Sequence, residues 1–166
     1  KDAGVTRALA AVDPVTLPRV ASARMVAGDL GALADGGVVL AEYTARQRGV
    51  GVGEHVTMTF ARTGTQRLPV VGIMRDRDAQ ALSTDYFISL STYRRHFVEN
   101  VDASIFVAYA DGIDPAAGRS ALESALAGAP TAELRDQAAA VAARTLLVDQ
   151  IFGLVSVLLL FAVVIA

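Results

Sequence analysis

The stretch GGVVLAEYTARQRGVGVGEHVTMTFARTGTQRLPVVGIM, residues 36–74, contains the patterns that predict the fold. An apolar strand over Val38–Leu40 is followed by one or two helical turns over Ala41–Arg48 and then by a glycine-rich turn. Two further strands, Val56–Ala61 and Leu68–Met74, flank the short turn RTGTQ, and such a pair forms a hairpin. The stretch therefore predicts a small sheet with a helix packed on it.

Strands and helices continue downstream in the same mixed order. Strands are predicted over Asp85–Leu90 and Ala103–Ala110, with a short helix from Ser91 to about Val98 between them. Asp114 is a suitable N-cap for a helix that starts at Pro115 and ends at Gly128. Because no βαβ repeat is visible, the pattern favours a mixed α+β domain of two small lobes with short strands and helices.

The remaining segments have weaker patterns. A last short strand is predicted in TAELR, residues 131–135. Within the first 36 residues, VDPVTLP is typical of a loop, and GDLGALADGG, which follows it, predicts a weak helical turn closed by glycines. These segments add little to the expected fold.

The chain closes on LLVDQIFGLVSVLLLFAVVIA, residues 146–166, which is uncharged from Ile151 onward. A helix that is apolar on every face must be buried on every face, either in lipid or in a large protein core. The 16 residues from Ile151 to Ala166 span about 24 Å as a helix, less than the ~30 Å of a hydrocarbon core. Since a domain of this size has little interior to surround such a helix, we expect a truncated transmembrane helix, with a central helix of a soluble core as the alternative.

The segment before this run favours one continuous helix. No Gly or Pro lies between Asp136 and Phe152, and Asp136 is a plausible N-cap. The predicted organisation is therefore an extracytoplasmic domain over residues 1–145 and the start of a membrane helix over residues 146–166. Because the chain also begins without Met or a signal peptide, both ends are interpreted as cuts within a longer protein.

Composition excludes several classes of protein. The 166 residues are 53% hydrophobic, contain no Cys and have a net charge of −2. A disulfide framework and a thiolate zinc site are excluded, and a nucleic-acid surface is disfavoured because it needs an excess of basic residues. The Arg-rich, Ala-rich composition is common in bacterial proteins encoded by GC-rich genomes.

Two features resemble ligand sites without meeting their requirements. The glycines Gly49, Gly51 and Gly53 lack the spacing of a dinucleotide-binding loop and the Gly-Lys ending of a P-loop. A turn after a helix, with Gly49 as the C-cap, explains them better. The histidines His55 and His96 lack a second ligand at metal-binding spacing.

Three polar groups are further candidates for chemistry. Ser89 and Ser91 are expected to be strand-end and N-cap residues rather than nucleophiles, since no Gly-x-Ser-x-Gly elbow is present. The cluster Arg75, Asp76, Arg77 and Asp78 predicts a solvated loop, with a contact patch for a partner as the alternative, and the same holds for Arg94 and Arg95. No catalytic, cofactor-binding or metal-binding residue is therefore predicted, and no cofactor is expected.

The order of these phrases resembles the extracytoplasmic domain of FtsX-like, MacB-type ABC transporter permeases. In that family a helix-and-turn phrase is followed by a strand that ends in Val-x-Gly-Ile, and here Glu54 replaces the commoner Asp. The resemblance covers roughly Val12 to Ala166. The matching positions are Val38, Val39, Glu42, Ala45, Gly49, Val52, Gly53, Glu54, Val56, Val70, Val71, Gly72 and Ile73.

The resemblance implies a function that the residues alone do not. Such permeases place this domain outside the cell membrane, between the first and second membrane helices, and couple ATP hydrolysis in the cytoplasm to export, lipoprotein release or regulation of a partner. The expected partners are an ABC nucleotide-binding subunit or domain, a second permease copy, an extracytoplasmic protein or lipid substrate and the membrane, but no nucleic acid. The domain itself is not expected to be an enzyme. The alternatives are a membrane-anchored sensor or ligand-binding module with one tethering helix, and a soluble enzyme that uses His55 or His96.

Overall fold

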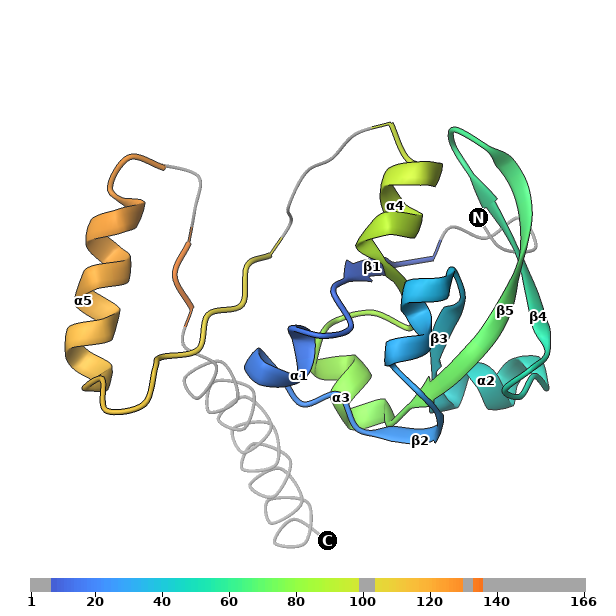
Figure 1. Cartoon of the computed structure of the whole chain (residues 1–166), viewed down its shortest axis with the longest axis horizontal. Coiled ribbons are helices and arrows are strands. Elements are labelled where there is room, and N and C mark those ends of the chain that lie inside the picture. The colour runs from blue at the N-terminus through green and yellow to red at the C-terminus, as the bar shows by residue number, and fades with distance from the viewer. Residues whose placement is uncertain (1–6, 99–103, 130–132, 136–166) are drawn as a thin grey trace, which may run out of the picture. The chain divides into compact units, whose positions relative to one another are not determined.

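The computed structural model describes residues 7–98, 104–129 and 133–135 (Figure 1). The chain divides into two units, Lys1–Ala108 and Tyr109–Ala166. The described elements of the first unit are β1 (Leu9–Val12), α1 (Leu17–Val20), β2 (Met25–Gly28), the 3-10 helix η1 (Gly31–Asp35), β3 (Val38–Ala41), α2 (Glu42–Arg48), β4 (His55–Phe60), β5 (Gly64–Met74), α3 (Asp76–Ala81), β6 (Tyr86–Ser89) and α4 (Leu90–His96). The second unit contains α5 (Pro115–Leu126).

The first unit is built on a mixed sheet with the strand order β1-β6-β3-β5-β2, and β4 pairs with β5 as the predicted hairpin. Strands β1 and β6 are parallel, as are β3 and β5, whereas β2 and β4 both run antiparallel to β5. The central strands β3 and β6 are buried along their whole length. The mixed α+β class predicted from the sequence is confirmed.

Two apolar layers bury the opposite faces of the sheet, because successive strand side chains point to opposite sides. On one face Val38 and Leu40 pack with Ala45 of α2, and Tyr93 of α4 contacts the same cluster. On the other face Val39 lies in a cluster to which α1, η1 and α3 contribute. Helices therefore cover both faces, and β2 stands at an edge of the sheet.

Between residues 36 and 98, the predicted strands β3, β4, β5 and β6 and the predicted helices α2 and α4 are present near their predicted positions, whereas α3 was not predicted. Gly49 adopts a left-handed φ of 64° and caps α2 through bonds to Ala45 and Arg46. The hairpin turns at Gly64, which also has a left-handed φ of 67°. Asp114 caps α5 by accepting a bond of 3.0 Å from the Ala117 amide.

Some predictions are wrong. Residues 104–110, expected as a strand, form no strand, because no described strand pairs with their backbone and their large apolar side chains stay exposed. Residues 133–135 of TAELR are likewise not in a strand. The loop expected at residues 12–18 contains the start of the short helix α1, whose Leu17 is buried.

The expected long terminal helix lies outside the described residues. Within the described ranges, no helix combines the length and apolar character needed to cross a bilayer. The predicted boundary at residues 145 and 146 falls in the same undescribed segment.

Candidate functional site

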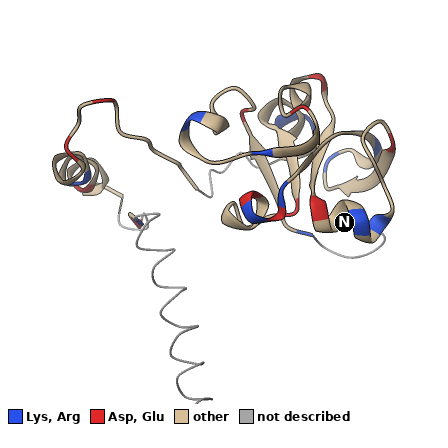
Figure 2. Ribbon diagram, turned by 90° about the horizontal axis from the view of Figure 1, so that it is seen from below, with Lys and Arg blue, Asp and Glu red and all other residues tan. Residues whose placement is uncertain are grey.

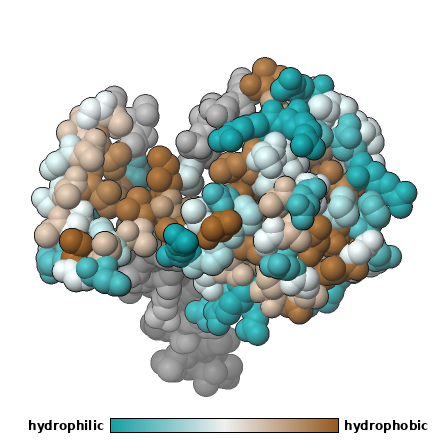
Figure 3. All heavy atoms as spheres, viewed as in Figure 1, coloured by the Kyte–Doolittle hydropathy of each residue, from teal (hydrophilic) through white to brown (hydrophobic). Residues whose placement is uncertain are grey.

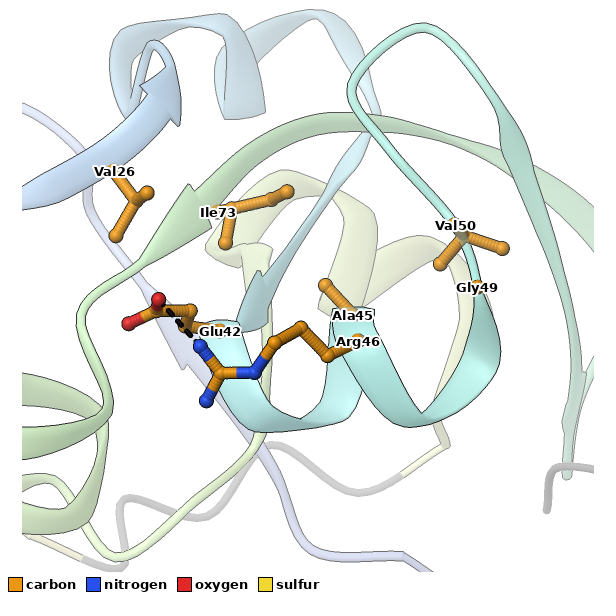
Figure 4. Close-up of a pocket in the computed structure, with 7 residues that line it drawn as sticks. All are labelled: Val26, Glu42, Ala45, Arg46, Gly49, Val50 and Ile73. Carbon is orange, nitrogen blue, oxygen red and sulfur yellow. Dashed lines mark hydrogen bonds and ion pairs between the residues drawn. The ribbon is translucent and has the colours of Figure 1, made fainter.

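A groove opens beside α2, at the uncovered margin of the sheet. It has a volume of about 300 Å³ and is lined by Val26, Glu42, Ala45, Arg46, Gly49, Val50 and Ile73. Figure 4 shows α2 along one side, with Val26 of β2 and Ile73 of β5 across from it. Most of this lining is aliphatic.

The local sequence explains why space is left here. The α2 residues Glu42, Ala45, Arg46 and Gly49 recur at helical spacing, so they share one face of the helix. Ala45 and Gly49 are small, and Cβ-sized space beside Gly49 is empty. Opposite them, Val26 lies at a register shift in the edge strand β2 and is 51% exposed. Because small residues lie beside this edge of the sheet, the groove has room for a side chain from another molecule.

One end of the groove carries a charged cluster that links α2 to α3. The Arg46 guanidinium donates to Glu42 at 2.5 Å and to Asp76 at 3.0 Å, while Asp76 also accepts a bond of 2.6 Å from the Tyr43 amide. These side chains are partly exposed, so their ion pairs add little stability. Because the guanidinium already holds two carboxylates, it is not free to bind a phosphate group.

The two histidines lie in different surroundings. His55 is exposed at the start of β4. His96 is only 6% exposed, shares a hydrogen bond of 2.6 Å with the Thr63 hydroxyl and stacks on Phe60 at 4.6 Å. Burial lowers the pKa of His96, and the positive charge of Arg95 lowers it further. His96 thus joins α4 to the hairpin tip.

Ser89 ends β6 as expected, but the N-cap expected at Ser91 is also Ser89, because α4 starts one residue earlier than predicted. Ser89 is the N-cap of α4, since its side chain accepts a bond of 3.1 Å from the Thr92 amide. Its hydroxyl also lies 2.8 Å from that of Ser91 and 2.9 Å from that of Thr92. Among the described residues, this hydroxyl cluster has no histidine as a hydrogen-bond partner.

The cluster Arg75–Asp78 was expected as a solvated loop, and this prediction is wrong for most of it. Residues 76–81 form α3, and Asp78 is 3% exposed. Its carboxylate accepts a bond of 2.8 Å from the Arg24 amide, which fixes the loop before β2. Burial opposes the charged form, but bonds from Arg24 and Ser22 outweigh it, so the pKa of Asp78 is lowered.

The groove itself was not predicted from the sequence. Arg94 and Arg95, the other charged candidates, are exposed in the last turn of α4. Val26 and Ile73 lie 47 positions apart in the chain and meet only through the pairing of β2 with β5. In the described part of the chain, no three His, Asp or Glu side chains gather as metal ligands.

Comparison with known protein families gives a match over most of the chain. A family model described as a MacB-like periplasmic core domain matches residues 3–125. This range contains every strand and helix of the first unit and most of α5. No curated protein matches the chain.

Proposed function

The chain belongs to the family of MacB-like periplasmic core domains, and from this premise we propose that it couples ATP hydrolysis on the cytoplasmic side to mechanical work outside the membrane. Family membership itself supports the placement of the chain as an extracytoplasmic domain of an ABC-type transporter permease. The family is not one of enzymes. The work we propose is export, lipoprotein release or regulation of a partner.

The family match over residues 3–125 is the observation on which this proposal depends. Family membership implies an association with an ATP-binding subunit and with the membrane. We further propose a second permease copy as a partner. These partners are proposed for the full-length transporter from the family match of this domain.

The groove beside α2 is consistent with a role in partner contact. Its aliphatic lining of Val26, Ala45 and Ile73 suits an apolar side chain. A nucleotide would need free cationic groups for its phosphates, and Arg46 is already paired. We propose that nucleotide binds in another subunit or domain of the transporter.

A rigid stalk is the proposed route of transmission. The sequence from Asp136 to Phe152 has no helix breaker before the apolar run, and a continuous helix transmits displacement along its axis. To test this, a Gly-Pro pair is inserted after Ala142 in the full-length transporter, and an Ala-Ala pair at the same place is the control. The Gly-Pro variant is expected to lose ATPase-coupled output while the control keeps more of it. Unchanged output with Gly-Pro refutes the stalk.

The permease assignment has its own test. The full-length protein is purified from membranes in mild detergent, and co-purifying proteins are identified by mass spectrometry. We expect an ATPase with a Walker-type nucleotide site, or such a domain fused to the same chain. A full-length protein with one membrane helix and a cytoplasmic signalling region would instead support the anchored sensor.

A further inference from the structure

A basic surface lies where the tip of the β4–β5 hairpin meets the last turn of α4. We call it the basic end and define it by Arg62, Arg94 and Arg95. Residues 57–67 and 90–98, which form the hairpin tip and α4, contain four arginines and His96 but no Asp or Glu. Figure 3 shows strongly hydrophilic side chains gathered over this end of α4.

Specific contacts hold the basic end together. The Arg62 amide donates to the His96 carbonyl at 3.2 Å, and the Arg62 guanidinium donates to the Arg94 carbonyl at 3.4 Å. The bond between Thr63 and His96 adds a third link between the same segments. Arg62 and Arg94, which are 32 positions apart in the sequence, are therefore held next to each other.

Within the described residues, no carboxylate neutralises the charge of the basic end. All three arginines are exposed, and none is ion-paired with a carboxylate among the described residues. By contrast, Arg46 holds two carboxylates and Arg119 holds Glu123. Elsewhere on the first unit, Figure 2 shows acidic residues interspersed with basic ones. Neighbouring like charges repel, so an anion from outside would stabilise this end.

The shape of the basic end selects the kind of anion. The hairpin tip and the end of α4 project from the sheet at the same end of the unit (Figure 1). Small ligands are usually held in concave pockets, whereas a projecting surface can lie against a flat layer. Val98 follows α4 and is 80% exposed, and an apolar residue beside cationic ones is typical of contact with a membrane interface.

We propose that the basic end binds the phosphate groups of anionic lipids on the outer surface of the membrane. Guanidinium groups bind phosphate oxygens through paired hydrogen bonds. The inference rests on the proposed function only because that function places the domain next to a bilayer. Each cationic side chain near an anionic surface strengthens binding about fivefold, so three arginines contribute about a hundredfold.

A local fluorescence assay tests the proposal. The chain has no Cys, so Thr65→Cys, at the exposed hairpin tip, provides a single labelling site. A fluorophore there is quenched by a lipid that carries a quencher in its headgroup, in phosphatidylcholine vesicles with or without phosphatidylglycerol. Because the signal comes from the hairpin tip, attachment of the chain through its apolar terminal residues does not by itself produce it.

The expected result has three parts. Quenching requires phosphatidylglycerol, weakens with added salt, and needs about a hundredfold more lipid in the triple variant Arg62→Gln, Arg94→Gln and Arg95→Gln. The matched control replaces three exposed arginines elsewhere on the unit, Arg19, Arg75 and Arg77, by Gln and is expected to behave like the parent chain. The control equals the triple variant in net charge, and circular dichroism checks that both are folded.

Several outcomes would overturn the proposal. Equal quenching without phosphatidylglycerol would show that lipid charge is not recognised, and an equal loss in the control would show a nonspecific effect of net charge. Complete competition by millimolar inorganic phosphate would identify a site for free phosphate instead. None of these outcomes affects the permease assignment, which is tested by co-purification of the ATPase.

Discussion

Replacing Asp78 by Ala is expected to destabilise the first unit strongly, although the residue lies in a charged, polar stretch of sequence. Asp78 is buried at the start of α3, and its carboxylate accepts bonds from the Arg24 amide at 2.8 Å and from the Arg24 side chain at 3.4 Å. Ser22 donates a further bond. The carboxylate thereby fixes the loop that leads into the edge strand β2.

The magnitude follows from these partners. A hydrogen bond to a charged acceptor stabilises a fold by about 1.5–3 kcal/mol, and an amide left without a partner costs about 1–3 kcal/mol. The Arg24 side chain is 61% exposed, so its ion pair adds little. We expect Asp78→Ala to lower the free energy of unfolding by about 3 kcal/mol. Asp78→Asn, which keeps an acceptor oxygen but loses the charge, is expected to cost about half as much.

Two measurements check this prediction. Urea denaturation followed by circular dichroism reports the free energy of unfolding, and hydrogen exchange at the Arg24 amide reports the local bond. The control is Asp85→Ala, which removes an exposed carboxylate and is expected to change stability by less than about 0.5 kcal/mol. Equal effects of Asp78→Ala and Asp85→Ala, with unchanged exchange at Arg24, would refute the reasoning.

The pH dependence of Asp78 gives a second check on the same bond. Because its folded pKa is lowered, the stability it contributes is present above its unfolded pKa, which is about 3.9, and is lost as pH falls through the folded value. This acid-dependent loss is expected to be smaller in Asp78→Asn. An unchanged acid limb in that variant would show that Asp78 does not hold its charge in the folded state.

Three other predictions concern the same unit. The pKa of His96 is lowered in the folded state. The stability that His96 contributes is therefore complete above its unfolded pKa of about 6.5 and declines as pH falls below that value. In His96→Phe, the free energy of unfolding should change less between neutral and mildly acidic pH. Gly28→Ala should lower the free energy of unfolding in urea by more than about 2 kcal/mol, because φ is 75° and a Cβ would lie 2.2 Å from the Val71 carbonyl oxygen. Gly36→Ala, with open space around the Cβ position, should lower it by about 1 kcal/mol. Equal losses in the two variants would contradict the steric argument. Ser89→Ala removes the N-cap of α4 and should lower the melting temperature by an amount equivalent to about 1 kcal/mol. Ser89→Thr keeps the capping hydroxyl and should retain more of the stability, and a loss as large as that in Ser89→Ala would argue against capping.

The predictions that depended on a few neighbouring residues, such as turns and helix caps, were largely confirmed. The cap at Gly49, the hairpin turn at Gly64 and the N-cap Asp114 were each readable from a few neighbouring residues, and the N-cap of α4 was predicted within two residues of its position. The strand expected at residues 104–110 has an equally clear apolar pattern but no described partner strand. A β-strand needs a neighbour for its backbone hydrogen bonds, and the sequence of one segment does not supply it.

The sequence by itself determined the class of the domain, the strands β3 to β6, the helices α2 and α4, and the family resemblance, because turns, caps and alternating apolar residues act over short distances. Only the tertiary structure decided the sheet order, the burial of Asp78, the groove between β2, β5 and α2, and the meeting of Arg62 with Arg94. Each of these joins residues at least 20 positions apart in the chain. Strand pairing and packing bring such residues together, and their burial and charge environment follow from contacts that no local pattern records.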